Sequence, residues 1–535
     1  MYQISNQQQL AIESNSPKIL CLASAGAGKT FTLIERISRL SKFVDPRSIL
    51  ALTFTNAAAF EMKERYRSMH TNETIPEFRT FHSFCYNLLV NDEDVLHALK
   101  YHKVPRIIDT DYLKRIQRTA RTQLNFRISE SKMKDKSKLS FKELAEIDTY
   151  NKLVSQKLKR NNYITFDILV QIVTDLFLSN AQCIQKYKDR YKYIFVDEFQ
   201  DTDTMQWEFA QSFTNAKLFV CGDALQAIYG FRGANSSIIK QLANDDTWDT
   251  IILDHNYRST KQICDYANNM SNYADESYRL IMQTDKSGPY VLEDYWGSVP
   301  YMHPIDTVVL DRIIENLDST EGTTAILCRT NNEIDTILSY MKSKNISVSS
   351  NPNNDESQNI CKCVFDNEYA ADWLSTFLDA DSYTDYIRLI TLNPDKSHIK
   401  VLVENYGDRK NINSRLYTII SIRRILKDTS MDIITKIKTI IKTLGYEIKN
   451  IEIADSIKCS KDLVNFCLDC IVNYNHNKVY VGTVHSVKGL EFDSVYLLGV
   501  NGYTWKLNTE ENQNLFYVGI TRAKTHLYVY KGEWR

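Results

Sequence analysis

A short loop of small residues directly after an apolar segment constrains the fold more than any other feature. Residues 18–22 read Lys-Ile-Leu-Cys-Leu, and residues 23–30 continue as Ala-Ser-Ala-Gly-Ala-Gly-Lys-Thr. In such a loop the small residues let backbone N–H groups approach phosphate oxygens, and the N-terminus of the next helix favours negative charge. Lys29 is then placed to reach the terminal phosphates and Thr30 to bind Mg²⁺. By itself the loop predicts that the chain binds ATP or GTP.

Short apolar runs along the chain predict the strands of two sheets. Each run is followed by polar or small residues, as are the buried parallel strands of α/β proteins. The first set lies at residues 18–23, 48–54, 193–196 and 218–221. The second set lies at residues 323–330, 479–484, 494–498 and 527–530. The sequence therefore predicts an α/β protein with two cores, each a parallel sheet flanked by helices.

Segments with a helical pattern interrupt both cores. With 535 residues the chain is too long for one compact core. In each predicted sheet, one segment with a mostly helical pattern separates the strands, so we expect one insertion in each core. The first core is expected at 1–96 and 191–265, its insertion at 97–190, the second core at 266–335 and 478–535, and its insertion at 336–477.

Composition limits the setting in which the chain works. The 65 Lys and Arg residues nearly balance 66 Asp and Glu residues, for a net charge of −1, so nucleic acid would have to be bound by local patches. One such patch is residues 113–142, with ten basic residues against two acidic ones. No apolar run of about 18 residues and no secretory leader is present, so we expect a cytoplasmic protein that does not bind membranes.

Two carboxylates follow the apolar run at residues 193–196. Asp197 and Glu198 are expected at the edge of the sheet, facing the phosphate loop. There Asp197 would hold Mg²⁺, and Glu198 would orient and deprotonate an attacking water. The sequence thus predicts a site that hydrolyses a nucleotide.

The order of the motifs resembles the UvrD/Rep/PcrA group of superfamily 1 DNA helicases. Asp-Glu-Phe-Gln-Asp, Gly-Asp-Ala-Leu-Gln, Asn-Tyr-Arg-Ser and Tyr-Val-Gly-Ile-Thr-Arg-Ala follow the phosphate loop at residues 197–201, 222–226, 256–259 and 517–523. The resemblance implies two RecA-like cores, each with a mainly helical insertion. It also implies an ATP-dependent helicase that moves 3′ to 5′ on single-stranded DNA and unwinds duplex in repair, replication or recombination.

The resemblance assigns the nucleotide site to residues of both cores. Gln226 would sense the γ-phosphate, and Arg258 and Arg522 would be arginine fingers that complete the catalytic set with Glu198. Gln8 would bind the adenine edge, which favours ATP over GTP, and Tyr257 would pack on the adenine. The predicted nucleotide contacts are Gln8, Ala25, Gly26, Ala27, Gly28, Lys29, Thr30, Tyr257, Gly489 and Glu491, with Mg²⁺ at Thr30 and Asp197.

The resemblance also implies a track for single-stranded DNA. Flat side chains stack on bases without reading their identity, at about 1–3 kcal/mol per base. Two departures from the family pattern stand out: Ala57 replaces the usual Lys, and Glu-Asn-Gln-Asn-Leu at residues 511–515 replaces the commoner Glu-Glu-Arg-Arg-Leu. Phe166 and Asp167 resemble a family signature with no assigned mechanism. The predicted DNA contacts are Thr55, Asn56, His82, Tyr229, Phe231, Arg232 and His485.

A second hypothesis belongs to a different class of protein. The same motifs would serve a UvrD-like ATPase that senses DNA within a phage-defence or other multi-protein complex and unwinds weakly. Both hypotheses give single-stranded DNA and junctions of single and double strand as partners, and both leave room for a protein partner such as a nuclease or repair factor. Unwinding of a tailed duplex by the isolated chain distinguishes them.

Overall fold

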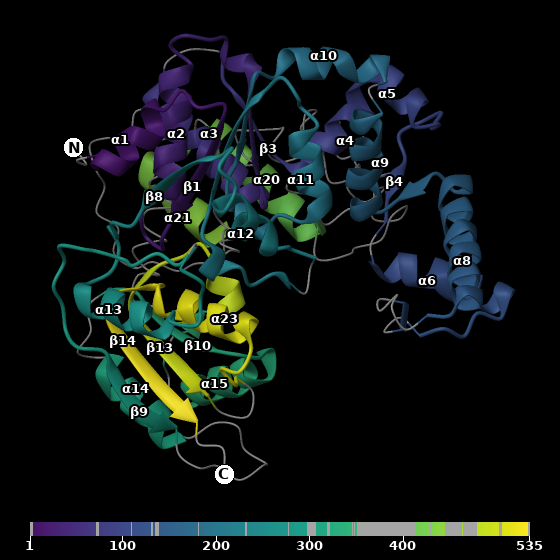
Figure 1. Ribbon diagram of the computed structural model, residues 1–535. Helices are drawn as coiled ribbons and strands as arrows, with labels where there is room; N and C mark the ends of the chain where they lie inside the picture. The colour runs from purple at the N-terminus through teal and green to yellow at the C-terminus, as the bar shows by residue number, and fades with distance from the viewer. Residues whose placement is uncertain are drawn as a thin grey trace.

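Two six-stranded sheets form the framework of the protein (Figure 1). Their strand orders are β3-β2-β6-β7-β1-β8 and β11-β12-β10-β13-β14-β9, and neighbouring strands run parallel. The predicted α/β class with two cores is confirmed. The computed structural model describes residues 4–70, 74–108, 110–129, 132–133, 139–179, 181–230, 233–276, 278–296, 307–317, 322–344, 346, 348–349, 412–428, 430–443, 463, 479–501 and 505–532.

The first sheet contains every strand that its apolar runs predict. The central strands β1 and β2 are almost wholly buried, as strands covered by helices on both faces should be. Two edge strands, β3 and β8, have mixed burial and were not predicted. The strands of this sheet are β1 (Lys18–Ala23), β2 (Ile49–Thr53), β3 (Glu77–Thr80), β6 (Tyr193–Val196), β7 (Lys217–Gly222) and β8 (Asp249–Leu253).

Helices cover both faces of the first sheet. Several of these helices pack together through an aromatic cluster, in which Phe209 and Phe213 contact each other and each also contacts Phe84 and Phe177. The helices are α1 (Asn6–Glu13), α2 (Lys29–Leu40), α3 (Asn56–Met69), α4 (Phe81–Asn91), α5 (Glu93–Ala98), α9 (Phe166–Leu178), α10 (Gln182–Arg190), α11 (Thr204–Gln211) and α12 (Ser237–Ala243), with the 3-10 turns η1 (Pro46–Ser48), η3 (Phe199–Asp201) and η4 (Ala224–Gln226).

The first insertion projects as an arm (Figure 1). A two-stranded ribbon of β4 (Arg106–Ile107) and β5 (Tyr163–Ile164) leads to α6 (Thr110–Leu124) and α8 (Phe141–Arg160). Phe126 and Tyr150 stack there with ring centroids 4.4 Å apart, in a small core of the arm's own. The arm is shorter than the expected insertion at 97–190, because α9 buries its apolar face in the first core.

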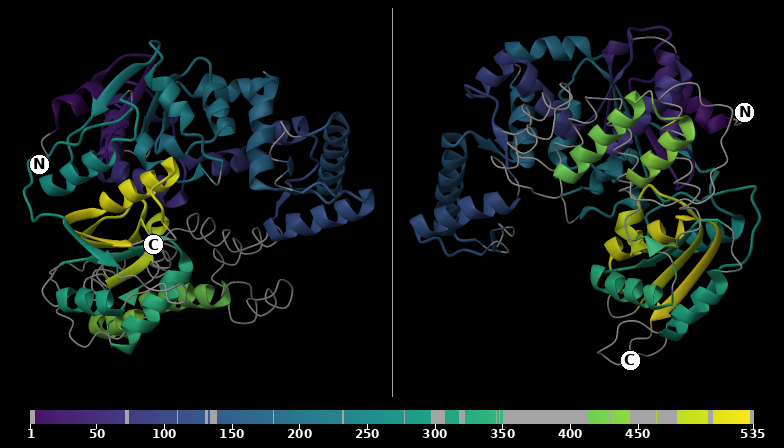
Figure 2. Two further views of the ribbon diagram at one scale, coloured as in Figure 1. Left: turned by 60° about the horizontal axis from the view of Figure 1, so that its bottom comes forward. Right: turned by 180° about the vertical axis from the view of Figure 1, so that it is seen from behind.

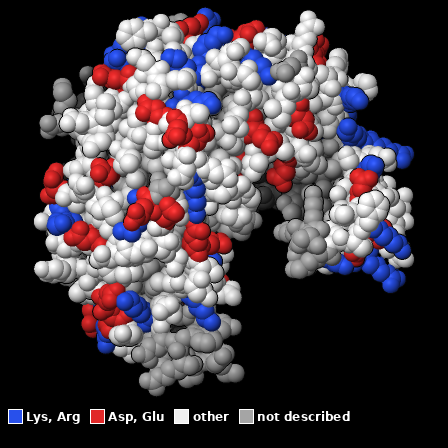
Figure 3. All heavy atoms as spheres, viewed as in Figure 1, with Lys and Arg blue, Asp and Glu red and all other residues white. Residues whose placement is uncertain are grey.

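Basic side chains lie along the outer edge of the arm, and an open notch separates the arm from the second core on the face shown in Figure 3. On α6 the exposed basic residues include Lys114, Arg115 and Arg118. Arg121 is half-buried instead, because its guanidinium lies over the rings of Phe126 and Tyr150. The described basic residues of the predicted run are thus solvated on the surface of the arm, apart from Arg121, and Lys134, Lys136 and Lys138 lie outside the described residues.

The second core is larger than the sequence predicts. The expected boundary at residue 335 falls inside α15, and β11 beyond it pairs with β12. Residue 265, the other expected boundary, falls inside α13, which packs on α23 and β14. The elements are β9 (Leu292–Trp296), β10 (Thr324–Cys328), β11 (Val348–Ser349), β12 (Val479–Thr483), β13 (Phe492–Val500), β14 (Ala523–Gly532), α13 (Lys261–Met270), α14 (Thr307–Leu317), α15 (Asn331–Ser343), α23 (Glu510–Ile520) and η6 (Val484–Val487).

The expected second insertion falls mostly outside the described residues. Its described helices, α20 (Ile412–Lys427) and α21 (Ile433–Thr443), pack together. They lie on the side of the molecule away from the viewer of Figure 1, as the view from behind shows (Figure 2). Within the described part of the chain, every helix is too short or too polar to cross a bilayer.

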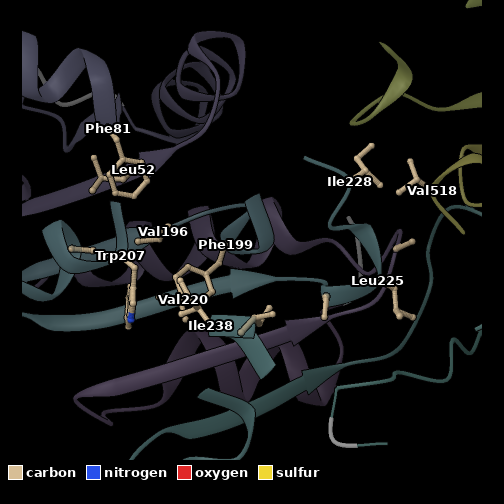
Figure 4. Close-up of a cluster of buried hydrophobic side chains, with 14 of the residues drawn as sticks. Leu52, Phe81, Val196, Phe199, Trp207, Val220, Leu225, Ile228, Ile238 and Val518 are labelled. Carbon is tan, nitrogen blue, oxygen red and sulfur yellow. The ribbon is translucent and has the colours of Figure 1, made fainter. Parts of the chain in front are cut away.

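The two cores share one hydrophobic cluster. Leu225 and Ile228, from the segment after β7, belong to the same cluster as Val518 of α23. Ile228 and Val518 point toward each other across the boundary between the cores (Figure 4). This contact places the segment after β7 directly against the second core.

Candidate functional site

The phosphate loop connects β1 to α2. Gly26 and Gly28 have φ angles of +71° and +77°, which residues other than glycine rarely adopt. Gly28 caps α2, so the helix begins at Lys29 with its first N–H groups facing the loop. This geometry is suited to hold phosphate oxygens at a helix N-terminus.

A segment between the cores clamps this loop. The Nδ2 atom of Asn256 donates to the carbonyl of Ala25 over 2.7 Å, and the backbone N–H of Tyr257 donates to the carbonyl of Gly26 over 2.9 Å. A Cβ atom on Gly26 would lie 2.8 Å from Asn256 Nδ2 and 2.9 Å from the Cβ of Arg258. Glycine is therefore required at residue 26 both by its φ angle and by this close approach.

The two predicted carboxylates lie beside the loop. The hydroxyl of Thr30 donates to Asp197 Oδ2 over 3.0 Å, while Asp197 Oδ1 is buried without a partner among the described residues. Burial, helped by the charge of Glu198, raises the pKa of Asp197 to about 7. Burial acts the same way on Glu198, but Lys29 and Lys488 outweigh it and lower the pKa of that carboxyl. A hydroxyl beside an orphaned carboxylate oxygen fits Mg²⁺, a cation that prefers oxygen ligands.

Gln226 contacts the second core at the sensor position predicted from the sequence. Its Nε2 atom donates to Asp223 over 2.7 Å, and its Oε1 atom accepts from Arg522 Nη2 over 3.3 Å. Arg522 is 1% exposed and donates also to the carbonyls of Val518 and Leu490. Burial, then repulsion from Arg258, lowers its pKa to about 9, so the guanidinium stays charged at neutral pH.

The second predicted finger is held differently. Arg258 Nε donates to Glu491 over 2.8 Å, and its Nη1 donates to the carbonyl of Thr521 over 2.9 Å. Glu491 also pairs with Lys524 at 3.2 Å. Gly489 turns the backbone just before this carboxylate with a φ of +88°. Arg258, Glu491 and Arg522 therefore lie close together at the boundary between the cores.

The two predicted adenine contacts also meet. The Nε2 atom of Gln8 donates to the carbonyl of Ala27 over 3.2 Å, and its Oε1 atom accepts from the Tyr257 hydroxyl over 3.3 Å. Arg36, which is buried, donates to three carbonyls at the end of α1 and so fixes the helix that carries Gln8. Gln8 and Tyr257 are thus bonded to each other beside the phosphate loop.

Three of the predicted DNA contacts, Tyr229, His485 and His82, take part in ring contacts. Tyr229 stacks on Phe54 with centroids 5.4 Å apart and lies 6.5 Å from the ring of His485. His82 meets the edge of the half-exposed ring of Phe166 at 5.4 Å. Phe54 and Phe166 were not predicted as contacts, although each adjoins a motif that was recognised.

The remaining predicted DNA contacts have local structural partners or lie elsewhere. Thr55 caps α3 by accepting from the N–H of Ala58, and Asn56 accepts from Thr80 over 3.4 Å. Burial lowers the pKa of His82, so it is neutral at physiological pH. Phe231 and Arg232 lie outside the described residues.

A buried ion pair that sequence reasoning missed joins the two cores. Lys488 Nζ lies 2.7 and 2.6 Å from the two oxygens of Asp201 and donates over 2.7 Å to the carbonyl of Gln226. Its ammonium also sits 4.9 Å from the ring centroid of Tyr229. Burial raises the pKa of Asp201 to about 6 although Lys488 opposes the shift. Asp201 ends the motif at residues 197–201, and Lys488 lies between the predicted site residues His485 and Gly489. The sequence separation of the two residues gives no sign that they pair.

The class of protein that this fold and site indicate agrees with comparison to known protein families. Residues 4–247 match the UvrD/REP helicase N-terminal domain, and residues 392–533 match the UvrD-like helicase C-terminal domain. The chain belongs to the UvrD-like helicase family. The N-terminal match covers the phosphate loop, the carboxylates and Gln226, and the C-terminal match covers Lys488, Glu491 and Arg522.

Individual relatives show the same relationship. Over its full length the chain is 27% identical to a probable DNA helicase II homolog of Rickettsia felis, of which it covers 93%. It is also 27% identical over its full length to the ATP-dependent DNA helicase PcrA of Bacillus subtilis, of which it covers 84%. A probable DNA helicase II homolog of Mycoplasma capricolum is 35% identical over 54% of the chain. That match spans only 44% of the Mycoplasma protein, less than half its length.

The Lys488–Asp201 pair generates a testable prediction. Lys488→Met leaves the carboxylate of Asp201, 3% exposed, without its buried partner. Breaking a buried pair in this way costs about 3–5 kcal/mol. Because the pair joins the cores, we expect the cleft to open and the radius of gyration measured by small-angle X-ray scattering to increase. Adding Asp201→Asn should recover part of the change by removing the unpaired charge.

Lys240→Met is the matched control. Lys240 pairs with Glu510 across the same boundary, but both side chains are partly exposed. Such a pair is worth about 0–1 kcal/mol, so the control should barely change the radius. Equal effects of Lys488→Met and Lys240→Met would contradict the role given to the buried pair.

Proposed function

We propose that the protein is an ATP-dependent DNA helicase that moves 3′ to 5′ along single-stranded DNA and unwinds duplex ahead of it. One observation carries the proposal: Gln226 and its neighbours touch both the nucleotide side and the DNA side of the cleft. Arg522 donates to the Gln226 side chain, Lys488 donates to its carbonyl, and Lys488 lies over Tyr229. A change at the phosphates therefore has a direct contact path to a base-stacking residue.

The nucleotide chemistry is divided between the cores. The loop from Gly26 to Thr30 holds the phosphates, and Lys29 neutralises the terminal ones. Glu198, with its lowered pKa, is ionised and able to accept a proton from the attacking water. Thr30 and Asp197 would hold Mg²⁺, which supplies charge neutralisation at the phosphates.

The second core provides the charge that stabilises the transition state. Arg522 stays charged, yet its hydrogen bonds go to carbonyl, amide and hydroxyl oxygens, which are neutral acceptors. Its charge is thus free to act on phosphate oxygens as negative charge develops. Arg258 differs, since Glu491 already pairs with it. We infer that Arg522 is the stronger of the two fingers.

The base specificity follows from the short helix α1. Gln8 carries both an amide donor and an amide oxygen, which match the donor and acceptor on the edge of adenine. Guanine presents a carbonyl oxygen in place of the amino donor of adenine, so the amide oxygen of Gln8 would find no donor there. Tyr257, bonded to Gln8, provides a flat face for the base. These contacts support ATP over GTP as the substrate.

The DNA side supports a single strand bound by stacking. Phe54, Tyr229 and His485 bring flat rings from both cores together, and Phe166 with His82 forms a second pair of rings on the first core. Bases of any identity can stack on such rings. The exposed basic residues of α6 support contact between the arm and duplex phosphates. Roles in repair, replication or recombination, alone or with a nuclease or repair factor, are consistent with this activity.

Strand displacement tests the proposal and separates it from the alternative. The isolated protein should displace the short strand of a 3′-tailed duplex with ATP, and should leave a 5′-tailed duplex intact. Glu198→Gln should bind ATP but lose at least about 100-fold in turnover, because the general base is lost. An ATPase that DNA stimulates without any displacement would support the DNA-sensing subunit instead. Turnover near wild type in Glu198→Gln would refute the assigned base.

The unequal fingers give a separate prediction. Arg522→Ala should lower kcat by about 1,000-fold or more while ATP affinity changes less, because the charge acts mainly in the transition state. Arg258→Ala should lose less, because its charge is already paired with Glu491. Steady-state ATPase kinetics with saturating single-stranded DNA measures both. Arg47→Ala, a surface arginine paired with Asp45, is the control and should keep wild-type rates. An unchanged kcat in Arg522→Ala would disprove a site shared by the two cores.

A further inference from the structure

A buried asparagine joins three segments that meet at the boundary between the cores. Asn514 lies in α23 and is 3% exposed. Its Nδ2 atom donates to the carbonyl of Ala227 over 3.1 Å, and its Oδ1 atom accepts from the hydroxyl of Tyr273 over 2.7 Å. Both ends of one short amide are thus used by different parts of the chain.

Each of the three segments carries part of the site. Ala227 lies directly after Gln226 and two residues before Tyr229. The helix that holds Asn514 ends two residues before Arg522, and Tyr273 follows α13, the helix after Arg258. The joint therefore links the residues next to Gln226 and Tyr229 to the helix that follows Arg258 and the helix that precedes Arg522.

The chemistry of the joint differs from the pattern of the family. Asn514 stands where the commoner Glu-Glu-Arg-Arg-Leu pattern has its second arginine. An asparagine side chain is short, neutral and both donor and acceptor, so it fixes the spacing of two partners closely. Burial raises the pKa of Tyr273, which keeps its hydroxyl protonated and able to donate. A long cation at residue 514 could not accept from that hydroxyl.

We propose that Asn514 and Tyr273 are positioning residues that transmit movement of the second core to residues 227–229. When the second core moves toward the phosphates, α23 pulls on the carbonyl of Ala227 and shifts the stacking ring of Tyr229. Loss of the joint leaves the nucleotide site intact but weakens its link to DNA. The inference rests on the proposed function, since it concerns how ATP turnover and strand movement are linked.

The experiment compares three single variants with the wild type. Asn514→Ala removes both hydrogen bonds, and Tyr273→Phe removes only the donor while keeping the ring. Asn512→Ala is the matched control, because Asn512 lies in the same helix but donates to the carbonyl of Lys506 within the second core. Four quantities are measured: ATP turnover without DNA, its stimulation by single-stranded DNA, base pairs unwound per ATP, and the Tm.

The joint predicts a specific split among these quantities. In Asn514→Ala, turnover without DNA should stay within about twofold of wild type, while stimulation and base pairs unwound per ATP each fall about three- to tenfold, the worth of one or two hydrogen bonds. Tyr273→Phe should change them in the same direction and by less. A double variant with Asn514→Ala and Tyr273→Phe should lose no more DNA stimulation or unwinding per ATP than Asn514→Ala alone, because both changes break the same joint. Asn512→Ala should shift the Tm similarly and leave the coupling unchanged.

Two other outcomes have distinct meanings. If Asn514→Ala and Asn512→Ala lower the Tm alike and both keep wild-type coupling, Asn514 merely buttresses α23 and the joint is refuted. If DNA does not stimulate the wild-type ATPase, the proposed function itself fails.

Discussion

Two cationic side chains of the second core, Arg522 and Lys488, hold the segment after β7, and the rest of the site depends on these contacts. Arg522 bonds the side chain of Gln226, and Lys488 bonds its carbonyl while pairing with Asp201. A backbone carbonyl held by a buried ammonium cannot shift unless the ion pair shifts too, because separating buried charges is costly. We therefore expect the segment after β7 and the second core to move together, and under the proposed function this one segment would respond to both nucleotide and DNA.

The hydrophobic contact and the ion pair have different parts in this arrangement. Ile228 and Val518 bury apolar area between the cores, an attraction with little directional preference. Hydrogen bonds at Gln226 and Ala227 are directional and set the register in which the cores meet. Apolar contact thus allows the cores to slide, and the polar contacts select the arrangements in which Arg522 faces the phosphate loop.

How far the sequence predicts the structure depends on the distance over which each contact acts. Lys29 and Asp197 were placed together because each follows a buried parallel strand, and such strands end at one edge of the sheet. Edge strands such as β3 and β8 were missed, since they are covered less completely and are less apolar. The sequence predicts that residues 97–190 are mostly helical, but it does not show that α9, within that segment, packs in the first core. The Lys488–Asp201 pair spans 287 residues, and no local pattern signals it.

The distribution of charge across the cleft explains why one arginine is free to act while other cations are fixed. Carboxylates of the first core gather beside the loop, and Asp201 neutralises Lys488. Glu491 neutralises Arg258 within its own side of the cleft. The hydrogen bonds of Arg522 go to neutral acceptors, and its guanidinium is buried from water. Burial makes that charge costly to hold, which lowers the pKa of Arg522, and in the proposed site the phosphates of ATP would offset the cost. Under the proposed function, closure of the cores over ATP would be favoured by the same guanidinium that stabilises the transition state, and loss of the terminal phosphate would remove that contribution.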